Sequence, residues 1–129
     1  MNTSLTLFGR VGLSLIFIIS GWGKIAAYAG TQQYMASAGV PGSLLPLVIA
    51  LELGGGLAVL TGAFTRWIAL ALAAFSLASA ALFHAHLGDA AQAINFWKNV
   101  AMAGGFLMLA AQGAGTLSLD HLRSKRRNA

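Results

Sequence analysis

The sequence predicts an all-α integral membrane protein built as a bundle of four helices. Two observations lead to this prediction. First, 57% of the residues are hydrophobic and only 9% are charged, whereas soluble domains have about 25% charged residues. Second, the apolar residues fall into four long stretches. A single domain of 129 residues buries too little surface to hide so many apolar side chains from water, so lipid is the expected solvent.

Each apolar stretch has close to the roughly 20 residues that cross a bilayer as a helix. The predicted helices cover about residues 5–25, 44–63, 67–84 and 94–112, within one membrane domain that spans residues 1–129. No stretch alternates as a barrel strand does, and each is twice the length of such a strand. Pro41 and its neighbouring glycines indicate a connection before the second helix. The short turn at 62–66 makes the second and third helices antiparallel neighbours.

The first helix also has features of a cleaved signal peptide, since Ala27-Tyr28-Ala29 fits the small-x-small cleavage pattern. However, Lys24 lies between the apolar run and that point, and the residues before Arg10 are not basic. Three further apolar stretches follow. We therefore expect the first helix to be retained as a membrane span.

The basic residues predict the orientation of the bundle. With the N-terminus inside, Arg10, Arg66 and the tail at 120–129 face the cytoplasm, whereas Lys24 and Lys98 fall on the outer side. The basic residues of the tail are Arg123, Lys125, Arg126 and Arg127. The positive-inside rule therefore predicts that both termini are cytoplasmic. A short basic tail on an apolar body does not indicate a nucleic-acid partner.

Glu52 is the strongest candidate for a functional residue. It lies roughly 12 Å along the helix from Leu44, near mid-bilayer, where a charge costs around 2.5–3.5 kcal/mol. It should face the bundle interior and have a partner, and we expect Lys98 or Arg10 in that role, with Lys24 directed to the headgroups. Glu52 is interpreted either as a structural clasp between helices or as a site for a proton, ion or substrate.

Two other helices offer polar faces to Glu52. Arg10, Ser14 and Lys24 share one face of the first helix, and Lys98 and Asn99 share a face of the fourth. The candidate buried polar cluster therefore comprises Glu52, Lys98, Arg10, Asn99 and Lys24.

Small residues beside Glu52 predict close helix packing. Gly54, Gly55 and Gly56 lack side chains, and Gly54, Ala58 and Gly62 repeat every four residues. This small-xxx-small ridge is typical of helices that approach one another closely in membranes. We expect all five residues to take part in packing.

The sequence contains no catalytic or cofactor motif. It has no cysteine, which excludes thiol chemistry by this chain. His84 and His86, with Asp89, could hold a metal ion only in an extended loop. Because histidines in a polar loop are usually solvated, no metal site is predicted.

Several motifs together resemble the DoxX family, and the resemblance covers nearly the whole chain. They are Ile18-Ile-Ser-Gly-Trp-Gly-Lys-Ile25, Tyr28-Ala-Gly-Thr-Gln-Gln-Tyr-Met35, Gly39-Val-Pro-Gly42, Leu51-Glu-Leu-Gly-Gly-Gly-Leu57, and Phe96-Trp-Lys-Asn99 followed by Gly104-Gly105. The short bacterial members of this family imply a multi-pass protein of the plasma (inner) membrane. The resemblance transfers no catalytic residue.

The resemblance implies a protein accessory to a membrane redox or quinone-linked system. Quinone is then the one cofactor candidate, and the expected partners are the lipid bilayer, membrane redox proteins and a second copy of the chain. The alternative is a small-molecule or proton carrier centred on Glu52, and a third hypothesis is an enzyme that itself acts on quinone. A polar cleft that reaches Glu52 would favour the carrier or the enzyme, whereas a dry, paired Glu52 would favour the accessory role.

Overall fold

The structure is a computed structural model that describes residues 2–129, and its regular elements are all helices. This confirms the all-α prediction. In chain order the elements are α1 (Thr3–Ala26), α2 (Tyr28–Ser37), the 3-10 turn η1 (Gly42–Leu44), α3 (Leu45–Ile49), the π-helical turn η2 (Ala50–Gly54), α4 (Gly55–Thr61), α5 (Thr65–Phe83), α6 (Ala90–Gln112) and α7 (Leu119–Asn128).

Three helices are long and apolar enough to cross a membrane. They are α1, the continuous helix Gly42–Thr61 that comprises η1, α3, η2 and α4, and α5. We call Gly42–Thr61 the second span. The fourth predicted helix also forms as α6, with 23 residues. Two helices lie where the sequence analysis assigned none: α2 within the connection at 28–43, and α7 within the basic tail.

Capping residues set several helix boundaries. Asn2 Oδ1 accepts a hydrogen bond from Leu5 N at the start of α1, and Asp89 Oδ1 accepts one from Ala91 N at the start of α6. Each satisfies a backbone donor that has no partner within its own helix. α4 and α6 end at Gly62 (φ 73°) and Gly113 (φ 82°), where positive φ favours glycine.

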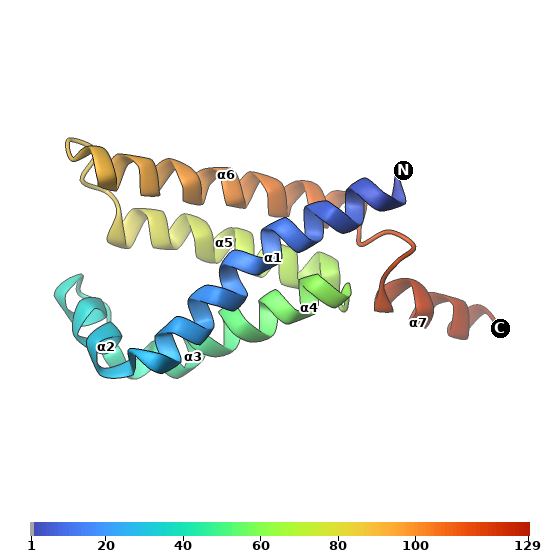
Figure 1. Cartoon of the computed structure of the whole chain (residues 1–129), viewed down its shortest axis with the longest axis horizontal. Coiled ribbons are helices and arrows are strands. Elements are labelled where there is room, and N and C mark those ends of the chain that lie inside the picture. Colours follow the sequence, from blue (N-terminus) through green and yellow to red (C-terminus); the bar gives the residue numbers. More distant parts are fainter. Residues whose placement is uncertain (1) are drawn as a thin grey trace.

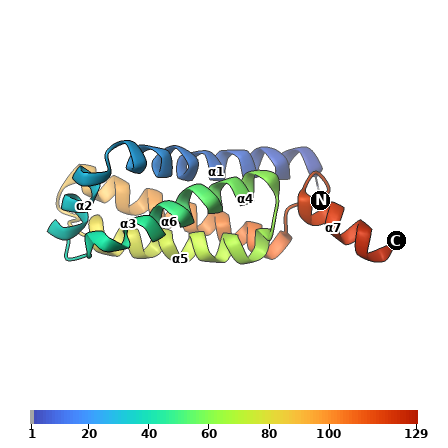
Figure 2. The same cartoon turned by 90° about the horizontal axis from the view of Figure 1, so that it is seen from below.

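The long helices pack along a common direction. α6 lies alongside α5, and α1 crosses the second span along η2 and α4 (Figures 1 and 2). Both termini and α7 lie at one end of the molecule, and α2 lies at the other (Figure 1). At the centre, Phe17 of α1 meets the edges of Phe106 and Phe75, with ring centroids 5.5 and 6.2 Å away. These rings join α1 to both α5 and α6.

Two glycines allow α1 and the second span to approach closely. A Cβ atom on Gly21 would lie 3.0 Å from Leu53 N, and one on Gly56 would lie 2.8 Å from Ile18 Cγ1 and 3.2 Å from Ser14 O. Since real Cβ atoms hardly ever come within 3.0 Å of another heavy atom, a larger residue at Gly56 would push the helices apart. Gly55 faces α5 instead, where a Cβ atom would lie 3.3 Å from Leu72 Cδ2.

The predicted ridge of Gly54, Ala58 and Gly62 does not form one packing face. Gly54 is exposed, and a Cβ there would meet nothing within 4 Å. Ala58 is half-buried, and Gly62 serves as the turn residue that ends α4. The second span instead turns Gly56 towards α1 and Gly55 towards α5, so the side that carries Gly54 is not a packed side.

Arg10 is buried and bonded to backbone oxygens rather than to an acid. Its Nε donates to Val59 O (3.1 Å) and its Nη2 to Leu60 O (3.0 Å), at the carboxyl end of α4. Its Nη1 donates to Ala114 O and Leu117 O, at 2.6 and 2.8 Å, in the segment between α6 and α7. Carbonyls at a helix end lack partners and carry partial negative charge. The expectation that Arg10 faces Glu52 is therefore wrong.

Asp120 fastens α7 to the start of α5. Its carboxylate accepts hydrogen bonds from Phe64 N (2.8 Å) and Thr65 N (2.9 Å), and its own N–H donates to Gly62 O (2.8 Å). Burial alone would raise the pKa of this carboxyl group. Hydrogen bonds from Thr65 and Phe64 and the charge of Arg123 outweigh burial, so the pKa lies below its ordinary value. The carboxylate thus caps α5 from a position 55 residues along the chain.

We predict that Gly56→Leu destabilises the protein by about 1–3 kcal/mol, the usual cost of overpacking a tight interface. The added side chain would collide with the backbone of α1 at Ser14 and Ile18. Equilibrium unfolding in mixed detergent micelles measures the effect.

Gly54→Leu is the matched control. It makes the same chemical change two residues earlier, where a Cβ has open space, and should leave the unfolding free energy nearly unchanged. Equal losses in the two variants would show that α1 does not pack closely on Gly56.

Candidate functional site

A buried ion pair joins α1 to the middle of the second span. Lys24 Nζ lies 3.0 and 2.9 Å from Oε1 and Oε2 of Glu52 and donates a third hydrogen bond to Ser20 Oγ at 2.6 Å. The Glu52 side chain is 5% exposed and that of Lys24 is 26% exposed. The ammonium group therefore uses all three of its donors.

This pairing corrects the expected partner of Glu52. Neither Lys98 nor Arg10 contacts Glu52, and Lys24 is not directed away to the headgroups. The reason lies in the close crossing of the helices. Gly21, one turn before Lys24, lies against Leu53, the residue after Glu52, so the two charged side chains lie at the same level.

Lys98 stands apart from this pair. Its side chain is exposed, and it has no ion-pair partner within residues 2–129. Asn99, the next residue, points to the other side of α6. Asn99 donates to Asn95 O at 2.9 Å and lines a cavity beside Glu52. Of the five residues in the predicted cluster, the structure thus brings together Lys24, Glu52 and Asn99.

A cavity of about 300 Å³ lies on one side of the ion pair, between α2, the second span and α5. Its walls are mainly aliphatic and aromatic, and Lys24 and Glu52 are its charged lining residues. The lining residues are Lys24, Thr31, Tyr34, Met35, Val40, Leu44, Val48, Glu52, Phe75, Ala78, Ser79, Leu82, Phe83 and His84. We call this the α2 cavity.

A second cavity of about 200 Å³ lies towards α1 and α6, and we call it the α6 cavity. Its lining includes Ile16, Phe17, Ser20, Asn99 and Met102. It shares Lys24, Glu52, Phe75, Ser79 and His84 with the α2 cavity. The ion pair therefore lies at the boundary between two spaces, each of which reaches it.

His84 is held in place at this boundary. Its Nδ1 lies 2.9 Å from Gln92 Oε1, across the turn between α5 and α6. The contact orients an imidazole ring that lines both cavities. Within residues 2–129 no three metal-ligating side chains come together, so the site has His84 as a single imidazole beside the ion pair.

Helix α2 forms one wall of the larger cavity, a role that the sequence analysis missed. Tyr34 stacks on Phe83 of α5 with ring centroids 5.3 Å apart and planes 20° apart. Met35 is buried, and Gln32 Nε2 donates to Gly42 O at 3.2 Å. The absence of glycine and proline from 31 to 38 is the signal that could have indicated this helix.

Comparison with known proteins places these features in a family. A sequence model of the DoxX family matches residues 5–85. The chain is 51% identical to the Inner membrane protein YqjF of Escherichia coli (strain K12) over 120 residues, which cover 93% of this chain and 92% of that protein. It is 42% identical to the Inner membrane protein YphA of the same strain over 123 residues, 90% of this chain and 88% of that protein.

A third relative matches over a shorter segment. The chain is 35% identical over 68 residues to a Bacillus subtilis (strain 168) protein named "Putative oxidoreductase CatD", which covers 53% of this chain and 51% of that protein. No solved structure matches the chain.

Proposed function

The chain belongs to the DoxX family and is an inner-membrane protein. From the cavities at its ion pair, we propose that it binds a small apolar molecule with a polar head, of the quinone class. This binding would serve a membrane redox system. The observation that carries this proposal is the α2 cavity, which ends at Lys24, Glu52 and His84. Its volume of about 300 Å³ is at the lower end of the range for small-molecule sites.

The chemistry of the cavity favours a neutral, planar ligand. Lys24 and Glu52 neutralise one another, so a charged ligand would add a net charge to an apolar site, which is costly within a membrane. A carbonyl oxygen could accept a hydrogen bond from Lys24 or from the His84 ring. Tyr34, Phe75 and Phe83 offer aromatic surfaces to a ring between these polar groups.

The role we propose is accessory: the chain holds the molecule, and partner proteins in the membrane carry out the electron transfer. The oxidoreductase name of the third relative supports a link to redox chemistry. This chain has no cysteine, so thiol chemistry must come from elsewhere. Glu52 is paired, as expected for an accessory role, and yet cavities reach it.

A second candidate function is a carrier of protons or small molecules centred on Glu52. The observation that favours it is the presence of a cavity on each side of the ion pair, with five lining residues in common. A proton moving between Glu52 and His84 would break the ion pair and change the charge at this boundary.

The membrane arrangement we propose has four crossings, made by α1, the second span, α5 and α6, as one domain over residues 1–129. α6 has 23 residues and is about 34 Å long, enough for a hydrocarbon core of about 30 Å. Arg66 and the basic residues of α7 lie at the end with the termini, whereas Asp89 lies at the other end. The positive-inside rule then makes both termini cytoplasmic.

We predict that reporter fusions after Phe83 and at the C-terminus give an outside and an inside signal respectively. The physical reason is the concentration of basic residues at the end with the termini, which resists export. Paired enzymatic reporters that are active on opposite sides of the membrane measure this. An exported C-terminus would contradict the arrangement.

We predict that a short-chain ubiquinone analogue binds the purified protein and that Ala78→Phe weakens this binding about tenfold or more, equivalent to about 1.4 kcal/mol. Ala78 lines the α2 cavity, and a phenyl ring there would fill space the ligand needs. Isothermal titration calorimetry in detergent measures the affinity.

Ala74→Phe is the matched control for that titration, because it places the same ring one turn away on the same face of α5, at a position that lines neither cavity. It should bind as the wild type does. Equal weakening in both variants, or no binding to the wild type, would contradict the proposed site. Glu52-dependent proton uptake by proteoliposomes without quinone binding would favour the carrier instead.

A further inference from the structure

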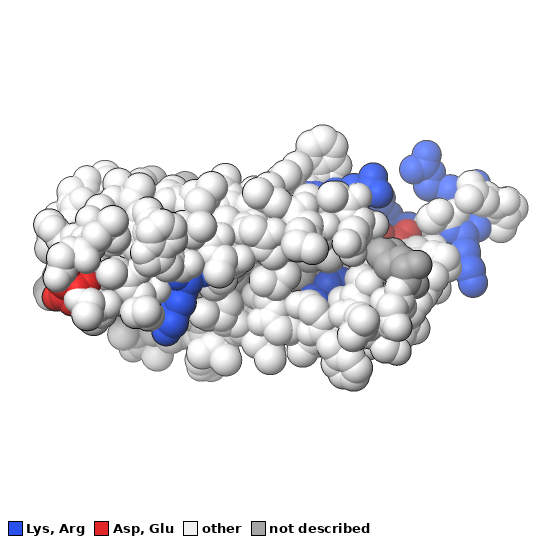
Figure 3. All heavy atoms as spheres, turned by 90° about the horizontal axis from the view of Figure 1, so that it is seen from above, with Lys and Arg blue, Asp and Glu red and all other residues white. Residues whose placement is uncertain are grey.

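Uncompensated positive charge gathers at the end of the molecule that carries α7. Figure 3 shows the basic side chains concentrated there. They are Arg66, Arg123, Lys125, Arg126 and Arg127, and Asp120 is the one acid near them. Its carboxylate already accepts two backbone hydrogen bonds, and its contact with Arg123 is long, at 4.0 Å.

A surface depression of about 480 Å³ lies within this cationic end. It is bounded by the first turn of α5, the segment between α6 and α7, and α7 itself. Arg66 lies over Gly113, where a Cβ would be 3.6 Å from Arg66 Nε. The Arg123 guanidinium lies 4.3 Å from the centre of the Phe64 ring. Two guanidinium groups thus line one depression, and Arg66 has no ion-pair partner within residues 2–129.

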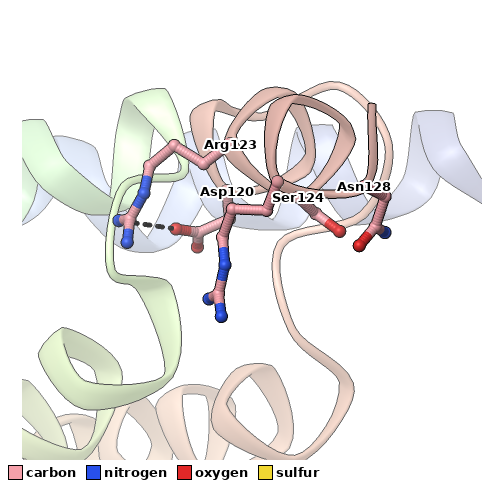
Figure 4. Close-up of a pocket in the computed structure, with 5 residues that line it drawn as sticks. Asp120, Arg123, Ser124 and Asn128 are labelled. Atoms are coloured by element: carbon pink, nitrogen blue, oxygen red, sulfur yellow. Dashed lines mark ion pairs between the residues drawn. The ribbon is translucent and has the colours of Figure 1, made fainter.

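The helix that carries the second guanidinium is held in position. Asp120 ties the first turn of α7 to α5 through three hydrogen bonds, and Arg123 lies one turn further along the same helix. Figure 4 shows Arg123 extending from α7 towards the Asp120 carboxylate, on the side away from Ser124 and Asn128. Because α7 is held by these bonds, its backbone loses little entropy when Arg123 meets a ligand, and the remaining cost is that of ordering the side chain.

Apolar side chains around the depression are exposed. Trp67, on its edge, is 77% exposed in the first turn of a membrane span, and tryptophan favours the membrane–water interface. On the other side of α7, Leu119 and Leu122 are exposed and share a shallow groove with Leu7 and Leu60 of the spanning helices. In the proposed membrane arrangement, the depression therefore lies at the level of the phospholipid headgroups.

We propose that this depression binds the phosphate of an anionic phospholipid, with Arg66 and Arg123 as its contacts and Trp67 beside its glycerol and acyl chains. A guanidinium pair matches the geometry of phosphate oxygens. The exposed tryptophan and leucines indicate a lipid rather than a soluble phosphate. The other basic residues of α7 attract anionic lipids to the site from the surrounding membrane.

The test uses Trp67 as its reporter. Full-length protein with Trp22→Phe and Trp97→Phe keeps Trp67 as its one tryptophan and is reconstituted into phosphatidylcholine vesicles that contain brominated phosphatidylglycerol or brominated phosphatidylcholine. We expect brominated phosphatidylglycerol to have at least about fivefold higher relative affinity near Trp67, since a single basic residue already contributes about that factor. Arg66→Gln with Arg123→Gln should abolish the preference.

Two controls make the result specific. A protein that keeps only Trp97, in the half of α6 remote from α7, should show no preference, and its quenching reports whether the double variant is folded. Lys125→Gln with Arg126→Gln removes the same charge outside the depression and should keep most of the preference.

Three outcomes would overturn the proposal. Equal quenching of Trp67 by the two brominated lipids would mean that no anionic lipid is selected. Equal loss of the lipid preference in the Arg66/Arg123 and Lys125/Arg126 double variants would mean that the attraction is diffuse and has no defined site. Millimolar inorganic phosphate should leave the preference for phosphatidylglycerol unchanged. If phosphate abolished that preference, the depression would be a soluble-anion site instead.

Discussion

The structure depends on the need to satisfy two positive charges that α1 carries into a low-dielectric environment. Arg10 and Lys24 lie roughly 21 Å apart along α1, and each bonds to the second span. Arg10 donates to backbone carbonyls at the end of α4 and beyond α6, and Lys24 pairs with Glu52. Between them, Gly21 and Gly56 allow the backbones to meet. The register of α1 on the second span follows from these contacts, and so does the position of both cavities.

Sequence reasoning identified what depends on composition and spacing. Long apolar runs predicted the helices, and the cost of a mid-membrane charge predicted that Glu52 faces inwards. The partner of Glu52 was missed because Lys24 can either pair or extend to the headgroups, and the choice depends on the π turn at η2 and on the close approach at Gly21. Arg10 was misassigned because the reasoning sought an acid, whereas its acceptors are backbone oxygens that composition cannot reveal. Asp120 caps a helix 55 residues away, a relation that only the tertiary fold creates.

The ion pair also connects the fold to the proposed function. It is a neutral but polar group in an apolar interior, and both cavities end on it. A ligand that reached Lys24 or His84 would compete with Glu52 or Gln92 for their hydrogens, so binding and the strength of the α1 contact should be linked. α2 contributes a wall to the larger cavity through Tyr34 and Met35, which gives this short helix a role in access. The cationic end with α7 is separate from this site and lies at the opposite end of the molecule from α2.

The most direct test of this account is a double-mutant cycle on Lys24 and Glu52, with unfolding free energies measured in mixed micelles. Lys24→Met and Glu52→Gln should each destabilise, because each leaves the other polar group buried without its partner. The double variant should lose less than the sum, with a coupling energy of about 1 kcal/mol or more. The same cycle with exposed Lys98→Met in place of Lys24→Met should give no coupling. Additive losses for Lys24 and Glu52, or a coupling of Glu52 to Lys98, would contradict the account.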